Sequence, residues 1–260
     1  MDLIKKQLNI TFLGTGTSQG IPMIASNDPV CLSKDLKDNR LRSSILISWD
    51  DFSFTVDCSL DFRQQMLREN VHSLNGVFFT HEHADHIGGL DDLRAFCYKI
   101  GEMPIYLNER TLKSLEKRFE YIFSIEHKYP GAPSVIPQIV DKAPFFVKGL
   151  EVVPIEVFHG DLPITAYRFA DFAYLTDVKS VSEKEKLKLQ NLDVLIVNAL
   201  RIDEHPTHFN LQEAIDFVLE ISPKKAYFTH ISHRLGFHSE VSKSLPSNVF
   251  LAYDGLKITV

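Results

Sequence analysis

Four side chains that can bind a metal ion lie within the six residues 81–86. This segment reads His-Glu-His-Ala-Asp-His, and the four are His81, His83, Asp85 and His86. Imidazole nitrogen and carboxylate oxygen together are typical ligands of zinc and its first-row neighbours. Four ligand types in six positions are packed too tightly for a surface accident, so this segment predicts a metal site.

The flanking residues indicate how the segment is presented. The apolar run Gly76–Thr80 precedes it, and Gly88, Gly89 and an apolar helical pattern follow it. We expect a strand that delivers the ligands at its carboxyl end, where a turn aims several of them at one point. The segment is not the helical His-Glu-x-x-His motif of zinc proteases, because position 85 is aspartate and a strand precedes it.

Short β patterns dominate both ends of the chain, and helical patterns alternate with them. Strands are predicted at residues 8–13, 44–49, 52–57, around Phe78, and at 105–107, 151–158, 165–169, 172–176, 192–197, 226–229, 249–252 and 257–260. Helices are predicted at 59–69, 86–100 and 109–119, then after Ser182, which forms a capping box with Glu185, and after the capping residue Asn210.

The middle of the chain has a different character. Between Tyr121 and Pro144, three prolines interrupt any periodicity, which indicates a long loop, a lid or a simple connector. On either side of it the two halves are similar, with strands first and then strands alternating with helices. This order favours an α/β protein built as a four-layer αββα sandwich with mixed sheets, in a single domain over residues 1–260.

Composition narrows the class of protein. With 260 residues, 44% of them apolar, the chain can bury a large core. A net charge of −6 gives no overall basic surface for nucleic acid, although a local patch could suffice. The three cysteines, Cys31, Cys58 and Cys97, lie too far apart for a disulfide framework. The first six residues do not form a signal peptide, and no run has the length of a membrane span, so we expect a cytoplasmic protein.

The segment at 81–86 resembles the signature of the metallo-β-lactamase fold superfamily. That resemblance implies three further ligands downstream, and His159, Asp177 and His230 match them, each directly after a predicted strand. A lone histidine after a strand is more often an ordinary polar residue. The assignment of these three residues as ligands therefore depends on the cluster at 81–86.

The resemblance also implies how two metal ions are shared. The first is held by His81, His83 and His159, the second by Asp85, His86 and His230, and Asp177 bridges them. Two ions roughly 3.5–4 Å apart lower the pKa of a shared water and so supply a nucleophile at neutral pH. Zinc is the first candidate, with manganese, iron or nickel as alternatives. Asp57 resembles an aspartate that supports the ligand loop, or it caps the following helix.

The amino-terminal region adds specificity. Residues 12–22 predict a strand and a glycine-rich turn, and the glycine spacing together with Pro22 and Pro29 excludes a dinucleotide fingerprint. With residues 40–44, this region resembles the phosphodiesterase branch of the superfamily. That branch holds transfer-RNA 3′-processing nucleases and phosphoribosyl cyclic phosphate phosphodiesterases. Many relatives carry several cysteines here for a structural zinc. Residues 25–31 contain one, so we expect no thiolate zinc and a loop that is hydrogen-bonded or mobile.

The stretch at 198–210 supports the same branch. The cyclic phosphate phosphodiesterases carry a histidine in a similar stretch ahead of the last metal ligand, and His208 matches it. The resemblance implies a general acid for the leaving alkoxide or a group that stabilises phosphoryl charge. Packing at the start of the helix capped by Asn210 is the alternative, and His205 is the less favoured neighbour.

Other basic residues are weaker candidates. Arg42, Arg201 and Arg234 could bind substrate phosphate, although each alone is more often a surface ion-pair residue. His233 and His238 follow the last ligand, and either could reach the pocket.

These observations favour a two-metal phosphodiesterase for a small cyclic or nucleotide-like phosphodiester, with Asp85 orienting or deprotonating the water and His208 assisting departure. The alternatives are a thioester or lactone hydrolase, a transfer-RNA nuclease, whose basic arm the 121–144 segment lacks, and a metal-binding scaffold without turnover. We expect no membrane partner and no stable nucleic-acid partner. The sequence leaves open whether the chain forms a homodimer.

Overall fold

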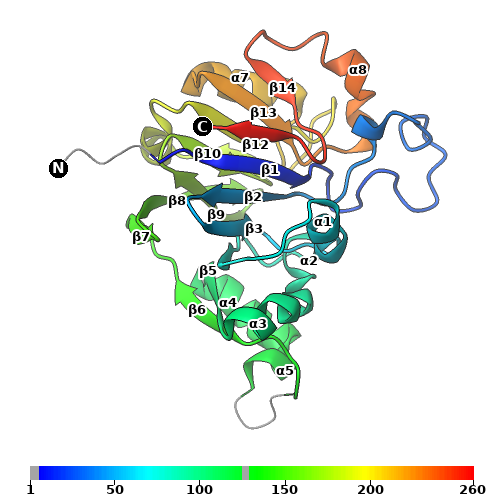
Figure 1. Cartoon of the computed structure of the whole chain (residues 1–260). Helices are drawn as coiled ribbons and strands as arrows, with labels where there is room; N and C mark the ends of the chain where they lie inside the picture. Colours follow the sequence, from blue (N-terminus) through cyan, green and yellow to red (C-terminus); the bar gives the residue numbers. More distant parts are fainter. Residues whose placement is uncertain (1–5, 125–128) are drawn as a thin grey trace.

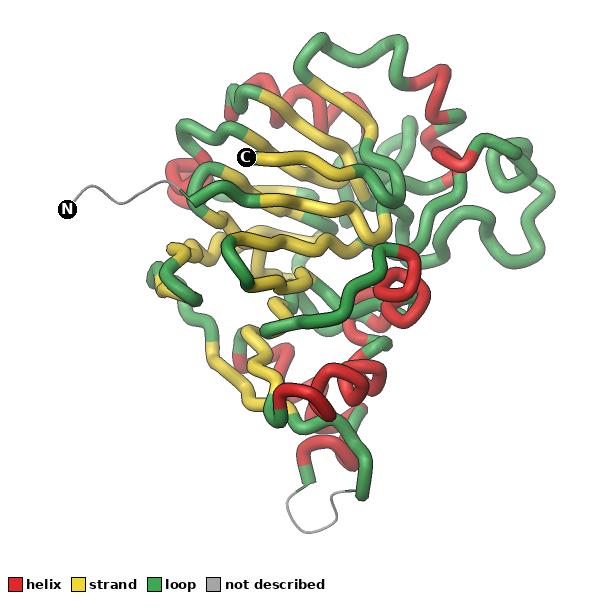
Figure 2. Tube along the Cα trace, viewed as in Figure 1, coloured by secondary structure: helices red, strands yellow, loops and turns green. Residues whose placement is uncertain are grey.

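Two mixed β-sheets lie face to face, with helices on their outer surfaces (Figure 1). The computed structural model describes residues 6–124 and 129–260. Figure 2 shows the strands stacked at the centre of the molecule and the helices at its periphery. This is the four-layer αββα sandwich that the order of strand and helix patterns predicted.

The first sheet has the strand order β15-β1-β2-β3-β4-β5-β6. Its strands are β1 (Asn9–Gly14), β2 (Ser44–Trp49), β3 (Phe52–Val56), β4 (Gly76–Phe78), β5 (Met103–Leu107), β6 (Val135–Ile139) and β15 (Lys257–Thr259). The four strands from β3 to β6 are parallel neighbours. Their carboxyl ends therefore meet at one edge of the sheet, and the 81–86 segment follows β4 at that edge.

The second sheet has the order β11-β8-β9-β10-β12-β13-β14, with β7 paired to β8. Its strands are β7 (Phe145–Val147), β8 (Leu150–His159), β9 (Leu162–Phe169), β10 (Phe172–Leu175), β11 (Ser180–Val181), β12 (Val194–Asn198), β13 (Lys225–Thr229) and β14 (Val249–Leu251). The strands β10, β12, β13 and β14 are parallel. The second sheet thus also presents a row of carboxyl ends.

Three apolar layers hold these elements together. Aromatic rings fill the space between the sheets, where Phe78 of β4 lies 5.3 Å from Tyr167 and 5.2 Å from Phe169 between ring centroids. A second cluster joins the first sheet to its helices and includes Phe96, and a third joins the second sheet to its helices and includes Val218. Burial on both faces explains why the strands are predicted by continuous apolar runs.

The helices are short apart from two. They are α1 (Phe62–Arg68), α2 (Ala84–Ile87), α3 (Arg94–Ile100), α4 (Glu109–Arg118), α5 (Glu120–Phe123), α6 (Glu183–Lys186), α7 (Leu211–Ile221) and α8 (His238–Val241), with 3₁₀ turns at Leu36–Asp38, Leu90–Leu93, Leu187–Leu189 and His233–Leu235. Asn210 caps α7, as predicted, and Glu213 completes a capping box there that was not predicted. Among the described residues, no helix is both long and apolar enough to cross a membrane.

The predicted helix at 86–100 is wrong as a single element, because it is divided into α2, a 3₁₀ turn and α3. The break falls at the two glycines. A Cβ atom at Gly89 would lie 2.2 Å from the carbonyl oxygen of Ser59, so only glycine allows the chain to pass this close. The backbone N–H of Gly89 donates to the carbonyl of Cys58 at 2.9 Å, which holds the break against the neighbouring loop.

The segment between Tyr121 and Pro144 is not a loop throughout, and that prediction is wrong for residues 121–123, which belong to α5, and for residues 135–139. Residues 135–139 form β6, which pairs in parallel with β5. Proline is tolerated at position 137 because β6 is the last strand of its sheet, where one side of the backbone needs no partner. Residues 125–128 of the segment lie outside the described residues.

A buried polar cluster ties the segment after β1 to the carboxyl-terminal part of the chain. We call it the Arg40 network, and it comprises Thr15, Asp38, Arg40, His238 and Asp254. Arg40 Nη1 donates to Thr15 Oγ1 at 2.8 Å and to a backbone carbonyl at 2.6 Å, and Nη2 donates to His238 Nδ1 at 3.1 Å. Asp38 accepts from the backbone N–H of His238 at 2.7 Å. Hydrogen bonds therefore hold this segment beside α8 (Figure 1).

Candidate metal centre

The first ligand segment follows β4 directly. The strand ends at Phe78, and after two further residues the chain reaches His81. The next residues form the single-turn helix α2, which has His83 before its first residue and carries Asp85 and His86. A strand followed at once by one helical turn places four ligand types on one short stretch of backbone.

The other three candidate ligands also stand at strand ends, in the second sheet. His159 is the last residue of β8, Asp177 lies two residues after β10, and His230 directly follows β13. Because the two sheets face each other, these ends converge on the segment that follows β4.

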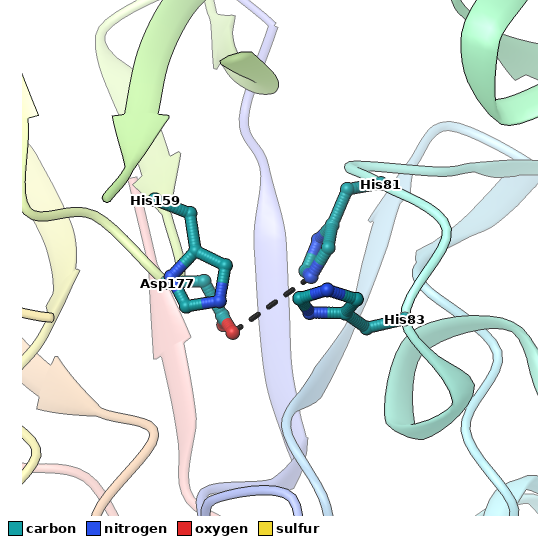
Figure 3. Close-up of side chains that lie close together, drawn as sticks. All are labelled: His81, His83, His159 and Asp177. Carbon is teal, nitrogen blue, oxygen red and sulfur yellow. Dashed lines mark ion pairs between the residues drawn. The ribbon is translucent and has the colours of Figure 1, made fainter. Parts of the chain in front are cut away.

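The seven side chains converge into two groups. The first comprises His81, His83, His159 and Asp177, and the second comprises Asp85, His86, Asp177 and His230. Within each group, one ligand atom from every residue lies within 4.8 Å of the others. Asp177 belongs to both groups, so its carboxylate stands where a bridging ligand would be needed. Figure 3 shows the first group, with the rings of the three histidines around the carboxylate of Asp177.

Three ligand nitrogens that face this carboxylate have no hydrogen bonds. His86 Nε2 and His230 Nε2 lie 3.3 and 3.2 Å from Asp177 Oδ1, and His81 Nε2 lies 3.8 Å from Oδ2. All three nitrogens are buried and without a hydrogen-bond partner. Buried polar atoms are normally satisfied, so this cluster fits a pair of bound cations better than a structural hydrogen-bond network.

Asp57 orients one of the ligands. Its Oδ2 lies 2.7 Å from His86 Nδ1, and its carboxylate also accepts from the backbone N–H and hydroxyl of Thr80. Because a carboxylate only accepts, His86 Nδ1 carries the proton and Nε2 is free to bind a metal. Asp57 therefore supports the ligand loop. The alternative of a helix cap is wrong, because α1 begins at Phe62 after Asp61.

The charge state of the group suits a cation. Burial lowers the pKa of His81 well below its usual range. Burial works against ionisation of Asp177 and Asp85. Nevertheless, His230 and His86 hold the pKa of the Asp177 carboxyl below its usual range, and His86 does the same for Asp85. The pKa of His86 is raised, against burial, by the surrounding carboxylates. A divalent ion would replace that proton as the positive charge in the site.

Three residues of the centre have a backbone conformation that favours glycine. The φ angles are +65° at Asp57, +59° at Asp177 and +54° at His230. A left-handed conformation costs free energy for residues with a side chain and is retained where the surroundings impose it. All three residues lie within two positions of the end of a strand.

His208 stands against both groups. Its ring centroid is 4.4 Å from that of His159 and 5.0 Å from that of His230, and its Nε2 lies 3.3 Å from Asp177 Oδ2. Burial lowers the pKa of His208 to about 4, against the effect of Asp177, so the imidazole is neutral near pH 7. His208 therefore faces the centre, and the helix that follows is capped by Asn210.

The three arginines proposed for substrate phosphate lie outside both groups. Arg42 donates to Asp61 Oδ1 at 3.0 Å and to the Ser18 carbonyl at 2.8 Å, so its side chain already holds the glycine-rich turn. Arg201 donates to two backbone carbonyls of its own loop. Arg234 is exposed, and within the described residues its side chain makes no hydrogen bond or ion pair.

Two features of the centre lack a clear sequence signal. Arg110 Nε donates at 2.7 Å to Glu82 Oε1, and Glu82 lies between two ligands. Thr207 accepts a hydrogen bond from His159 Nδ1 on its carbonyl at 2.8 Å, and its hydroxyl lies 2.9 Å from His208 Nδ1. For the contacts of Thr207, the one hint in the sequence is that this residue directly precedes His208. His238 belongs to the Arg40 network rather than to the centre.

Comparison with known proteins agrees with this geometry. The model of the β-lactamase superfamily domain matches residues 53–231. A solved structure described as a new diphosphatase from the PhnP family is 38% identical to this chain, covers 98% of it and is itself covered to 97%, with a TM-score of 0.92.

Two curated proteins that are similar to this chain are named for other activities. An octanoyltransferase of Porphyromonas gingivalis is 39% identical over 251 residues, which are 95% of this chain and 51% of that protein. A ribonuclease Z of Methanococcus maripaludis is 29% identical over 170 residues, which are 62% of this chain and 48% of that protein. The chain thus spans about half the length of these relatives.

Proposed function

The chain belongs to the metallo-β-lactamase superfamily and, within it, to the PhnP family, and from this premise we propose that it hydrolyses a small phosphodiester. The hydrolase class follows from the superfamily. The finer proposal is supported by the similarity to a diphosphatase over nearly the whole chain. A cyclic or nucleotide-like diester is the favoured substrate. A dinucleotide diphosphate, which would be cleaved at its phosphoanhydride bond with a phosphate as the leaving group, is the second candidate.

The observation that carries the proposal is the position of His208 against both metal-ligand groups. Its Nε2 lies 3.3 Å from the carboxylate of Asp177, which belongs to both groups. A donor at this point can hydrogen-bond to an oxygen that gains negative charge as a phosphodiester breaks. With a neutral imidazole, the donor is the Nε2–H, so charge stabilisation is favoured over transfer from an imidazolium.

The remaining roles follow from the ligand set. When bound, two divalent ions would supply a nucleophile from water and neutralise phosphoryl charge. His81, His83 and His159 would hold one ion, Asp85, His86 and His230 the other, and Asp177 both. The carboxylate of Asp85 is partly exposed, with 12% of its side chain accessible, so it can also orient or accept a proton from water. Zinc is the first candidate metal.

Two other activities share this ligand set. A thioester hydrolase would fit the acyl chemistry in the name of the Porphyromonas gingivalis relative, although this chain matches only about half of that protein. A nuclease would fit the ribonuclease Z similarity. Neither gives His208 a more specific task than the phosphodiester does.

A substrate panel tests the proposal. The zinc- or manganese-loaded protein would be given bis(p-nitrophenyl) phosphate, a small cyclic phosphodiester, a dinucleotide diphosphate, an acyl thioester and a precursor transfer RNA. We expect metal-dependent turnover of the small diesters, loss on chelation, and little activity on the thioester. Exclusive thioester cleavage, or cleavage of the RNA alone, would overturn the proposal.

A further inference from the structure

We infer that Thr207 fixes the tautomer and orientation of His208 through its hydroxyl, and is a positioning residue for the reaction. The inference rests on the proposed function for its catalytic meaning, but the tautomer itself is a property of the protein alone.

His208 Nε2 lies 3.3 Å from Asp177 Oδ2. An ionised carboxylate can only accept a hydrogen bond, so Nε2 must carry the hydrogen. In the neutral imidazole the other nitrogen, Nδ1, is then bare and needs a donor.

Two groups lie near His208 Nδ1, the hydroxyl of Thr207 at 2.9 Å and Nδ1 of His205 at 3.2 Å. His205 Nδ1 also lies 3.3 Å from the backbone nitrogen of Thr207, which can only donate, so His205 Nδ1 is an acceptor. Two bare nitrogens cannot bond to each other. The Thr207 hydroxyl is the remaining donor, and it is nearer to His208 than to His205, at 2.9 Å against 3.2 Å.

The methyl group of Thr207 packs against Gly160, where an added Cβ atom would lie 2.9 Å from Thr207 Cγ2. Because Gly160 has no Cβ atom, the methyl group can lie this close, and glycine also adopts the φ of +63° at this position without strain. With the methyl held against Gly160, the hydroxyl points toward the histidine rings.

The backbone of the same residue orients a metal ligand. The Thr207 carbonyl accepts from His159 Nδ1 at 2.8 Å, which leaves Nε2 of that ring to face the centre. Thr207 thus holds one ring by its backbone and a second by its side chain. A substitution that keeps the backbone and the methyl can separate these two roles.

Thr207→Val is that substitution, because it is close to isosteric and removes only the hydroxyl. We expect both metal ions and KM to be retained, and kcat to fall about ten- to a hundredfold, since His208 would no longer present Nε2–H consistently. Thr207→Ser should restore kcat to within about threefold. Thr165→Val is the matched control, because it removes a buried hydroxyl that bonds to Asn108 outside the centre.

A second readout does not depend on turnover. ¹⁵N NMR of the zinc-loaded protein reports which ring nitrogen of His208 carries hydrogen. We expect the Nε2–H tautomer in the wild type and a mixture with the Nδ1–H tautomer in Thr207→Val. A wild-type His208 with hydrogen on Nδ1, or a Thr207→Val variant with unchanged kcat and tautomer, would overturn the inference. Lack of phosphodiester turnover by the wild type would instead remove the proposed function and leave the NMR result to decide this point.

Discussion

Two polar clusters are buried near the loop ends of the sheets, and they differ in how their hydrogen bonds are satisfied. In the Arg40 network, no side chain has a buried nitrogen or oxygen without a partner. In the metal centre, His81, His86 and His230 each have at least one such nitrogen. Both clusters join segments that are distant in the sequence, so distance along the chain does not explain the difference.

The difference separates a structural task from a functional one. A buried group that has all its partners contributes to holding the fold, and removing one partner leaves the others unsatisfied. In a cluster whose polar atoms converge without hydrogen bonds to one another, those atoms need a bound group, such as a metal ion, to interact with. We therefore expect variants of the two clusters to fail in different ways, and the following predictions are ordered by the size of the effect.

Asp177→Ala should have the largest effect, because Asp177 belongs to both ligand groups. We expect loss of bound metal and a fall in turnover of more than about a thousandfold, since the metals contribute several kcal/mol to transition-state stabilisation. Metal analysis and a phosphodiesterase assay measure the two effects. Asp216→Ala, an exposed aspartate on α7, is the control, and retention of both metals in Asp177→Ala would contradict the bridging role.

Arg40→Met should fail in the opposite way. It leaves Thr15 and His238 without their shared donor, so we expect the free energy of unfolding to fall by about 3–5 kcal/mol. Metal content should be unchanged in the folded protein. Denaturant titration measures the first quantity, and Arg63→Met at an exposed position on α1 is the control. A variant as stable as the wild type would show that the network is not structural.

His208→Ala tests whether a residue against the centre can be separated from metal binding. We expect both ions to remain and kcat to fall about a hundredfold, which is the scale for loss of one positioned acid or hydrogen-bond donor. The exposed His72→Ala is the control. Normal turnover would remove His208 from the reaction, and loss of metal would make it a ligand instead.

The pH dependence of stability gives the smallest expected effect, in the Arg40 network. Burial and Arg40 lower the pKa of His238 to about 4, so folding favours its neutral form. The unfolded chain takes up this proton below about pH 6.5, so the contribution is full above that pH and is lost as pH falls toward 4. Between pH 7 and pH 5 the wild type should lose about 2 kcal/mol more unfolding free energy than His238→Gln. Parallel curves for the two proteins would contradict this.

The sequence predicted the features that are recorded locally. The dense cluster at 81–86 stands on one short turn, and His159, Asp177 and His230 follow apolar strands. Burial of both sheet faces made those strands visible as apolar runs. The helix cap at Asn210 is likewise local, because its side chain accepts from the backbone N–H of Glu213 three residues later.

Features that depend on contacts between distant segments were not predicted. Pro137 argued against a strand, yet β6 forms because an edge strand needs partners on one side only. Gly88 and Gly89 looked compatible with a continuous helix, but the neighbouring loop forces a break there. Arg40 finds its partners more than 190 residues away in His238 and Ala252, and no local pattern announces such a pairing.

Metal content per chain tests the central claim most directly. The protein would be saturated with zinc, freed of excess metal and analysed by inductively coupled plasma mass spectrometry, with Asp177→Ala alongside. We predict two divalent ions per wild-type chain and loss of both in the variant. A wild-type chain that retains no metal under these conditions would contradict the account, because the converging nitrogens and carboxylates would then have another purpose.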